Sequence, residues 1–292
     1  MSKSRKERKT PKLDPSGCPS SHACRNMTYI GGPERYPVPD DMVSWSVPYP
    51  DYTPVDYTDP KVHPENPVWA DPQDHTKLKF NKVDGKVNRK SHTGELRIED
   101  GLPLNPVGRT GLRSRGILGK WGCNHAADPV VTRWKKEDGE VVKHSESGKP
   151  ILQFVSIKRL DTGDWAIPGG MVDAGDTVSR TLKKEFGEEA LNTNVMDKKE
   201  VKKVEKQVAA LFKKGDVLYK GYADDPRNTD NAWMETIAVN YHDKTGDFDN
   251  FKLCAGDDAG MVRWLDIEQG LELYGAHKFF VSGAAKVNGA HW

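Results

Sequence analysis

Short runs of apolar, β-branched and aromatic residues occupy the second half of the chain, with the partial alternation that is typical of β-strands. Five runs have this pattern, at residues 129–134, 151–157, 217–222, 233–241 and 261–267. Helical segments interrupt them without a regular strand–helix–strand period. The order of these runs therefore predicts a mixed sheet with helices packed on it, which is an α+β architecture.

Apolar residues recur at helical spacing in three segments, at residues 178–191, 199–214 and about 267–285. This spacing predicts amphipathic helices that bury one face. The third segment is the weakest of the three, because Gly275 and Gly283 dilute its pattern. The chain is thus expected to form an α+β sandwich with helices packed on a mixed sheet.

Proline is concentrated near the N-terminus, where 13 of the 19 prolines lie between Pro11 and Pro72, interleaved with aromatic residues. Proline disrupts regular strand pairing, and the aromatic residues are too frequent for a disordered linker. Residues 75–127 add short polar stretches with turn signals. We expect a flexible basic tail at residues 1–27, a small loop-rich N-terminal lobe at residues 28–128 and the main domain at residues 129–292.

The 292 residues include 44 Lys and Arg against 43 Asp and Glu, which gives a net charge of +1. This balance provides no overall field to hold nucleic acid. No apolar run approaches the roughly 18 to 20 residues that a membrane span needs. Four cysteines are too few for a disulfide framework, and the first dozen residues lack the apolar core of a signal peptide. An intracellular, reducing compartment is expected.

A glycine turn precedes the first predicted helix. Gly169 and Gly170 follow a strand, at a position where the backbone can approach a ligand closely. Within the helix, Glu185, Glu188 and Glu189 occupy positions i, i+3 and i+4, so the three carboxylates share an arc of about 100°. Apolar residues border this arc, so it faces the protein interior.

Clustered carboxylates that face inward repel one another and lose hydration, which costs several kcal/mol unless a cation neutralises them. Mg²⁺ or Mn²⁺ would do so, because these ions prefer oxygen ligands and commonly combine carboxylates with substrate phosphates. The alternative is an ordinary surface helix with Glu/Lys pairs four residues apart. Taken alone, the helix sequence leaves both interpretations open.

The spacing from Gly170 to Glu189 resembles the Nudix box, G-x5-E-x7-R-E-U-x-E-E, with Asp176 and Lys184 in place of the box Glu and Arg. Leu191 also stands where the general pattern has glycine. The resemblance implies a Nudix fold, which is a three-layer α/β/α sandwich, and hydrolysis of a nucleoside diphosphate linked to another group. It further implies a metal site formed by Gly170, Glu185, Glu188 and Glu189, and catalytic roles for Glu185, Glu188, Glu189 and Lys184.

Four longer stretches, at residues 108–112, 124–134, 219–236 and 255–260, are similar to one Nudix branch. This branch comprises the ADP-ribose pyrophosphatases of animal mitochondria and the C-terminal domain of melastatin-type transient receptor potential channels. The resemblance implies that ADP-ribose is the substrate or ligand. It assigns ligand contacts to His125, Asp128, Ile167, Gly175, Asp225, Arg227, Tyr274 and His277.

Several assignments have a structural alternative. Arg227 either binds the pyrophosphate bidentately or forms a simple ion pair with Asp225 or Asp230. The general base is Glu185, Glu188 or a carboxylate of the Asp257–Asp258 pair, whose alternative is a tight turn with exposed acids. Each of the other polar contacts could instead be a satisfied structural residue.

Three functions are compatible with these motifs. The first is Mg²⁺-dependent hydrolysis of ADP-ribose to AMP and ribose 5-phosphate, with Mn²⁺ as a possible replacement, in the cytoplasm or in mitochondria. The second is an ADP-ribose sensor that contacts other domains of a channel subunit and has weak or no turnover. The third is a Nudix hydrolase for another substrate, because the box positions metal and pyrophosphate without selecting the leaving group.

Overall fold

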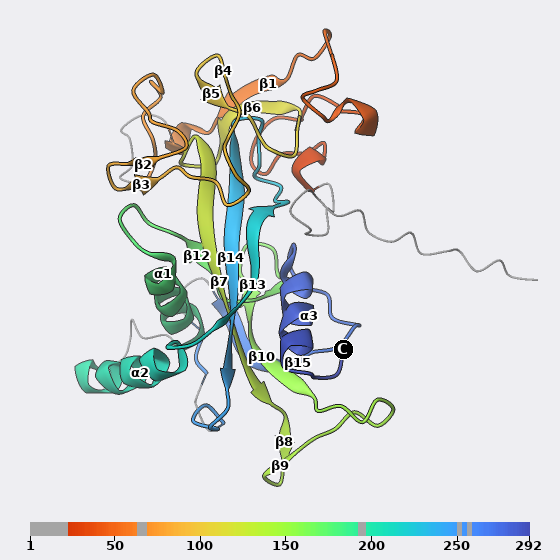
Figure 1. Ribbon diagram of the computed structural model, residues 1–292, viewed down its shortest axis with the longest axis vertical. Coiled ribbons are helices and arrows are strands. Elements are labelled where there is room, and N and C mark those ends of the chain that lie inside the picture. The colour runs from red at the N-terminus through yellow and green to blue at the C-terminus, as the bar shows by residue number, and fades with distance from the viewer. Residues whose placement is uncertain (1–22, 63–68, 192–196, 250–252, 256–258) are drawn as a thin grey trace, which may run out of the picture.

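The computed structural model describes residues 23–62, 69–191, 197–249, 253–255 and 259–292. Within these ranges, a long twisted sheet forms the centre of the molecule, and the loop-rich N-terminal lobe is stacked on one end of it (Figure 1).

Two parallel strands, β7 (Gly122–Trp134) and β14 (Ala232–Asp243), form the middle of the sheet and pair along twelve register positions. The remaining strands of this seven-stranded sheet are antiparallel to their neighbours. They are β10 (Leu152–Arg159), β11 (Trp165–Ala166), β12 (Gly170–Met171), β13 (Asp216–Ala223) and β15 (Ala259–Asp266). A mixed sheet and all five predicted strands are confirmed. The first strand starts at Gly122 instead of Pro129, because its early residues already pair with β14.

The first predicted helix consists of two parts. It begins as α1 (Val178–Glu185) and continues as a π-helical turn at Phe186–Ala190. The side chain of Thr177 caps α1 by accepting a hydrogen bond from the backbone N–H of Arg180. The second helix, α2, spans Lys198–Leu211.

The third predicted helix is shorter than its sequence pattern suggests. The helix α3 spans His277–Val287, so the expected start near residue 267 is wrong. Residues 267–276 form turns instead, and Gly275 in this segment adopts a left-handed conformation with φ of 49°. An α-helix cannot continue through a residue in this conformation.

Helices cover both faces of the sheet, as Figure 1 shows: α1 and α2 lie on one side and α3 on the other. The first interface contains Val131 and Val155 from the sheet together with Leu182 and Val208 from the helices. On the opposite face, strand residues pack against α3 through residues such as Phe280. The predicted α+β sandwich is therefore confirmed, with a buried core on each side of the sheet.

The N-terminal lobe is built mainly from loops. Its regular elements are short: 3-10 turns at Ala23–Arg25, Asp40–Met42 and Pro60–Val62, and strands β1 (Val55–Thr58), β2 (Val83–Asp84), β3 (Val87–Asn88), β4 (Ile98–Glu99), β5 (Leu102–Pro103) and β6 (Leu112–Gly116). A further small hairpin, β8 (Lys136–Glu137) and β9 (Glu140–Val141), follows β7. The predicted domain boundary between residues 128 and 129 falls inside β7, so one strand belongs to both parts.

The end of the predicted tail at residues 1–27 differs from expectation. The backbone N–H groups of Ala23 and Cys24 each donate a hydrogen bond of 2.9 Å to the carboxylate of Asp224. This contact joins residues about 200 positions apart, so residues 23–25 are ordered against the main domain and are not a flexible tail.

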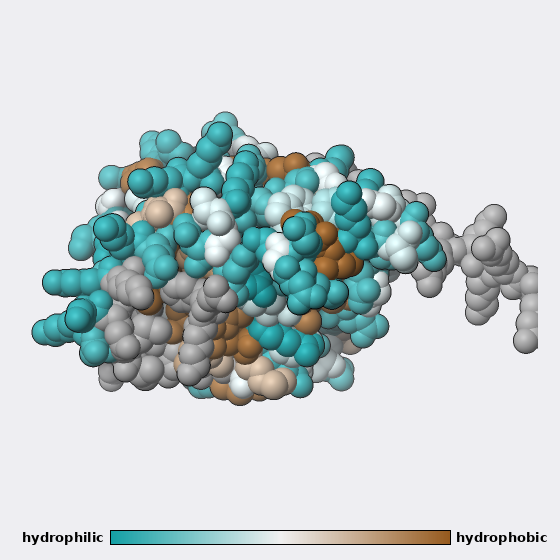
Figure 2. Space-filling model, turned by 90° about the horizontal axis from the view of Figure 1, so that it is seen from below, coloured by the Kyte–Doolittle hydropathy of each residue, from teal (hydrophilic) through white to brown (hydrophobic). Residues whose placement is uncertain are grey.

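Among the described residues, no helix has the length and apolar character needed to cross a bilayer. Figure 2 views the molecule from below and shows mostly hydrophilic side chains on this face, with hydrophobic side chains gathered in a few small areas.

Candidate active site

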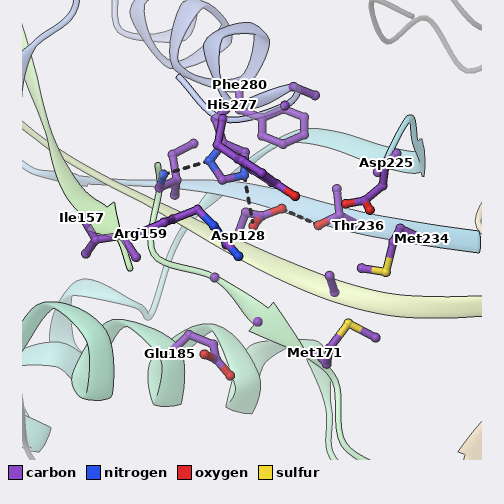
Figure 3. A pocket seen from close by; sticks show the side chains of 18 of the residues that line it. Asp128, Ile157, Arg159, Met171, Glu185, Asp225, Met234, Thr236, His277 and Phe280 are labelled. Carbon is purple, nitrogen blue, oxygen red and sulfur yellow. Dashed lines mark hydrogen bonds and ion pairs between the residues drawn. The ribbon is translucent and has the colours of Figure 1, made fainter. Parts of the chain in front are cut away.

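A cavity of about 530 Å³ opens between the central strands, the glycine turn before α1 and the start of α3 (Figure 3). Strands β7, β10 and β14 provide one part of its lining, and α1 and the loop after β13 provide others. Both carboxylates and guanidinium groups line it, together with apolar side chains such as Ile157 and Phe280. A cavity of this size and mixed polarity fits a small polar ligand that also has a flat apolar part.

Two glutamates from the α1 region face this cavity. Glu185 ends α1 and Glu189 lies in the π-helical turn that follows. One carboxylate oxygen of Glu189, Oε2, accepts a hydrogen bond of 2.8 Å from the backbone N–H of Gly169. The glycine turn is thereby fixed against the helix, and the two carboxylates lie beside backbone that can approach a ligand closely.

Burial raises the pKa of Glu185 to about 7; the charge of Lys184 lowers it, and the charge of Glu188 raises it. A buried carboxylate with such a pKa is readily held in its ionised form by a bound cation. Since Glu185 and Glu189 offer oxygen donors next to a glycine turn, these residues fit a hard divalent ion such as Mg²⁺.

A hydrogen-bonded group of side chains forms the opposite side of the cavity, as Figure 3 shows. The backbone N–H of Ile167 donates to Nδ1 of His277 at 2.9 Å, so this nitrogen carries no proton. The proton of the neutral ring is therefore on Nε2, which lies 3.9 Å from Oδ1 of Asp128. The hydroxyl of Thr236 donates to the other oxygen of Asp128 at 2.5 Å.

Burial shifts both titratable groups of this network toward their neutral forms. It lowers the pKa of His277 to about 3 and raises the pKa of Asp128 to about 6. At neutral pH, His277 is thus an uncharged donor through Nε2. The network can orient a ligand hydroxyl or phosphate oxygen through directed hydrogen bonds.

Two arginines line the same cavity. Arg227 binds Asp225 bidentately through Nε and one terminal nitrogen, both at 2.8 Å. Burial raises the pKa of Asp225, but the charge and the hydrogen bonds of Arg227 together outweigh this effect, so the pKa is lowered overall. The second guanidinium, of Arg159, lies 4.5 Å from the ring centroid of Tyr274 and binds Asp161. Together they bring two permanent positive charges to the cavity.

The N-terminal lobe holds the loop that carries Arg227. The hydroxyl of Tyr29 donates to the carbonyl oxygen of Arg227 at 2.9 Å. Arg35, which is 2% exposed, donates to the carbonyl oxygens of Pro226 at 2.7 Å and Asn228 at 2.8 Å. Consequently, the position of this loop depends on residues almost 200 positions earlier in the chain.

A second set of bonds secures the end of the same loop. Asp230 accepts hydrogen bonds from the backbone N–H and the hydroxyl of Thr110 and from the hydroxyl of Tyr52. The N-terminal lobe therefore satisfies the carboxylate of Asp230. Of the two ion-pair partners suggested for Arg227, Asp225 and Asp230, the structure shows Asp225.

Comparison with known proteins places this chain in a family. Residues 38–122 match the N-terminal domain described as NUDT9-like. The chain is 54% identical over 280 residues to the mitochondrial ADP-ribose pyrophosphatase of Rattus norvegicus, and the match covers 94% of this chain and 80% of that protein. This chain belongs to the NUDT9-like family of Nudix hydrolases. It is also 45% identical to putative nudix hydrolase 6 of Caenorhabditis elegans, over 88% of this chain and 94% of the worm protein.

The NUDT9-like family also includes domains of much larger proteins. The chain is 49% identical to transient receptor potential cation channel subfamily M member-like 2 of Nematostella vectensis. That match covers 92% of this chain but only 18% of the channel. The predicted membership of this branch is confirmed by both kinds of relative.

Most residues that the sequence assigned to the site line the cavity. They are Asp128, Ile167, Gly170, Glu185, Glu189, Asp225, Arg227, Tyr274 and His277. They come from distant parts of the chain, and the fold brings them together around one space.

Four assigned residues do not line this cavity: His125, Gly175, Lys184 and Glu188. Lys184 forms an exposed ion pair with Asp173 at 3.2 Å. Glu188 belongs to the π-helical turn, where the spacing of side chains around the axis differs from that of an α-helix. The three glutamates were expected to share one face of the helix, but only Glu185 and Glu189 line the cavity.

His125 and Gly175 are placed away from the cavity for different reasons. Side chains alternate along β7, and since Ala126 and Asp128 face the cavity, His125 points to the other face. The backbone N–H of Gly175 donates to the carbonyl oxygen of Lys86, in the N-terminal lobe. The proposed base Asp258 lies outside the described residues.

Several cavity residues were not assigned from the sequence, among them the polar residues Arg159, Asp224 and Thr236. Thr236 lies within a predicted strand, and Arg159 ends β10, two residues beyond the predicted end of that strand at residue 157. Their contribution depends on which strands are neighbours, and the order of strands is not readable from residue patterns.

Proposed function

We propose that this chain hydrolyses the pyrophosphate bond of ADP-ribose to give AMP and ribose 5-phosphate, with Mg²⁺ as the metal. The observation that carries the proposal is a single cavity lined by the box carboxylates Glu185 and Glu189 and by the guanidinium groups of Arg159 and Arg227. A pyrophosphate needs both kinds of group, one to hold a metal and the other to bind phosphate oxygens directly. The similarity to the rat ADP-ribose pyrophosphatase supports the choice of substrate.

Nudix hydrolases generally need a divalent metal ion, and the candidate ligands are oxygen atoms, which suit both Mg²⁺ and Mn²⁺. We propose Mg²⁺, with Mn²⁺ as a possible replacement. Glu185 and Glu189 would hold it, together with Glu188 and the carbonyl oxygen of Gly170. When bound, the metal would neutralise the pyrophosphate and lower the pKa of a coordinated water.

The remaining cavity residues suit the rest of the ligand. Arg227 and Arg159 can bind phosphate oxygens through their planar donors. Nε2–H of neutral His277 can donate to an oxygen of the ligand, and the rings of Tyr274 and Phe280 offer flat surfaces to a base or sugar.

Glu185 is the proposed general base, because its carboxylate lines the cavity beside Gly170 and has two oxygens, one for the metal and one that can accept a proton. The attacking water would transfer its proton to this carboxylate while the phosphorus–oxygen bond to the leaving phosphate breaks. Asp258 and Glu188 are the alternatives for this role.

Incubation with ADP-ribose in Mg²⁺, in Mn²⁺ and in EDTA, followed by chromatography, tests the proposal. The expected products are AMP and ribose 5-phosphate in equal amounts, formed with metal and absent with EDTA. Comparable kcat/KM values for NADH or an ADP-sugar would contradict the choice of ADP-ribose.

A sensor function is the second candidate, and the 49% identity to the Nematostella channel favours it. A sensor would bind ADP-ribose, leave it intact and pass the signal to other channel domains. Calorimetric binding without formation of AMP would establish this function in place of hydrolysis. For the enzyme we propose a location inside the cell, in mitochondria or cytoplasm, in line with the mitochondrial relative.

A further inference from the structure

A second group of chemically active side chains lies on the other face of β7. His125 on β7 and Glu235 on β14 are register partners in the parallel pair. His92 of the N-terminal lobe approaches them, and the ring centroids of His92 and His125 are 4.5 Å apart. Candidate ligand atoms of the three residues all lie within 4.8 Å of one another.

Three imidazole nitrogens in this group lack a hydrogen-bond partner in good geometry among the described residues. They are Nε2 of His92 and both ring nitrogens of His125, and all three atoms are buried. The backbone of Asn88 and Lys90 comes close to the His125 ring. Buried polar atoms are nearly always paired in native proteins, so three such atoms in one place need an explanation. A bound cation would account for one nitrogen of each ring, because it accepts a lone pair from each. The second nitrogen of His125 can then donate its proton to the nearby backbone of Asn88 or Lys90.

Glu235 is fully buried, and within the described ranges it takes part in no ion pair. Its carboxylate is held in place by neutral donors. Oε1 accepts from the hydroxyl of Ser91 at 2.6 Å and from the indole N–H of Trp233 at 3.0 Å, and Oε2 accepts from the backbone N–H of His92 at 2.6 Å. Three acceptor positions are used, which leaves one of about four for a metal. Hydrogen bonds of this type commonly orient metal-binding carboxylates.

We propose that His92, His125 and Glu235 bind one Zn²⁺ ion at the junction of the N-terminal lobe and the central sheet. Two imidazoles and a carboxylate are a ligand set that Zn²⁺ uses, whereas Mg²⁺ favours oxygen ligands alone. This site is therefore chemically distinct from the box carboxylates.

The geometry requires a small closure of the ligands around the ion. Zn–N and Zn–O bonds of about 2.0 to 2.2 Å place tetrahedral ligand atoms roughly 3.3 Å apart. The ligand atoms must therefore move by about 1 Å, which side-chain rotation can provide. Burial lowers the pKa of both histidines, which are therefore in the neutral form that binds metals. His92 also lines a second cavity of about 530 Å³, which gives the ion a route to the site.

The consequence is a cross-link between the two parts of the chain. His92 belongs to a loop of the N-terminal lobe, while His125 and Glu235 belong to the paired central strands. Zn²⁺ would fix this loop to the sheet and stabilise the folded protein in proportion to its occupancy.

Metal titration of the full chain tests the site. After treatment with a chelator and its removal, the protein is titrated with Co²⁺ and then with Zn²⁺ in the absence of substrate. We expect one equivalent of Co²⁺ with the visible absorption bands of a four-coordinate ion, displaced by one equivalent of Zn²⁺. An absence of stoichiometric binding by the wild-type chain overturns the proposal without any variant.

Two variants locate the ion. His92→Ala and His125→Ala should each weaken Zn²⁺ binding by at least about 100-fold, more than the loss of an outer partner typically does. Circular dichroism identifies any variant that does not fold, in which case the other carries the test. Unchanged Zn²⁺ binding in a folded variant overturns the assignment.

A surface histidine pair provides the matched control. His144 and His291 stack with ring centroids 3.6 Å apart and could collect Zn²⁺ adventitiously. The variant with alanine at both positions should still bind one equivalent of Zn²⁺. A loss of Zn²⁺ binding in this variant would overturn the buried site. Glu189→Gln should also keep Zn²⁺ while losing Mg²⁺-dependent turnover, which separates this site from the proposed active site.

Discussion

The carboxylate of Glu185 lies directly against the α-carbon of Gly170. A Cβ atom at position 170 would be 2.5 Å from Cδ of Glu185 and 2.5 to 2.6 Å from both of its carboxylate oxygens. Two residues of the box, fifteen positions apart, are therefore in contact across the turn and the helix. The absence of a side chain at position 170 is what lets Glu185 reach this place.

Gly170→Ala should displace the Glu185 carboxylate and lower kcat for ADP-ribose by about 100-fold, because a shift of about 1 Å at a catalytic group has this effect. Steady-state kinetics at saturating Mg²⁺ measure the change. Gly270→Ala is the matched control, since its nearest neighbour would be Glu268 Oε1 at 3.9 Å. Equal activity of the two variants would contradict the inferred role of this contact.

Glu189→Gln preserves the shape of the side chain but removes the charge that a metal requires. We expect kcat to fall at least about 100-fold while the protein remains folded. The exposed Glu146→Gln variant should behave as the wild type. Full Mg²⁺-dependent turnover by Glu189→Gln would show that this residue does not hold the metal.

The pH dependence of metal binding follows from Glu185. Its pKa is raised from 4.5 to about 7 by burial, so the folded state binds more protons than the unfolded state between these values. This group therefore makes the metal-free protein less stable as pH rises from 4.5 to 7.

The affinity for a metal changes with pH in the opposite direction and rises as pH rises, because the cation needs the ionised carboxylate. Mg²⁺ affinity should fall about fivefold between pH 7 and pH 6, as calorimetry would measure, because the ionised fraction of Glu185 falls from about one half to about one tenth. Removing the titrating group in Glu185→Gln should abolish most of this slope. A wild-type affinity that is constant over this range would exclude the raised pKa.

Arg35→Ala should destabilise the protein by roughly 2 to 3 kcal/mol, because it removes a buried guanidinium and leaves the carbonyl oxygens of Pro226 and Asn228 without this donor. The KM for ADP-ribose should rise as well, since Arg227 lies between these two residues. Thermal melting and kinetics report the two effects separately. Arg97→Ala, at a side chain that is 58% exposed, should change neither.

A truncated chain that begins at Pro129 should neither fold nor hydrolyse ADP-ribose. It would lack the first half of β7, which pairs with β14 from Gly122 onward, and every bond from Tyr29, Arg35 and Thr110. Circular dichroism and product analysis are the measurements. A folded, fully active product would show that the N-terminal lobe is dispensable.

Local patterns predicted the strands, the helices and the box carboxylates, because side-chain periodicity and fixed spacing act over a few residues. Glu185 and Glu189 were found in this way. The π-helical turn that contains Glu188 and Glu189 was not predicted, since it depends on how the end of the helix packs. Nor could the sequence show which face of β7 carries His125, because this depends on where the strand begins.

Long-range contacts were the least predictable part. Arg159 reaches the cavity only because β10 pairs with β7, and the Arg227 loop is held by Arg35 from the far end of the chain. Such relationships depend on strand order and on the packing of loops, for which neighbouring residues give no signal.

The shared strand β7 also limits how this domain can be transferred between genes during evolution. A cut at the boundary between the N-terminal lobe and the main domain would divide a strand that both parts need, so selection would act against separating them. The alignment to the Nematostella channel agrees, because it spans 92% of this chain and includes both parts within a far longer polypeptide. Gene fusion must therefore transfer the N-terminal lobe and the main domain together, because the lobe supports the fold of the main domain.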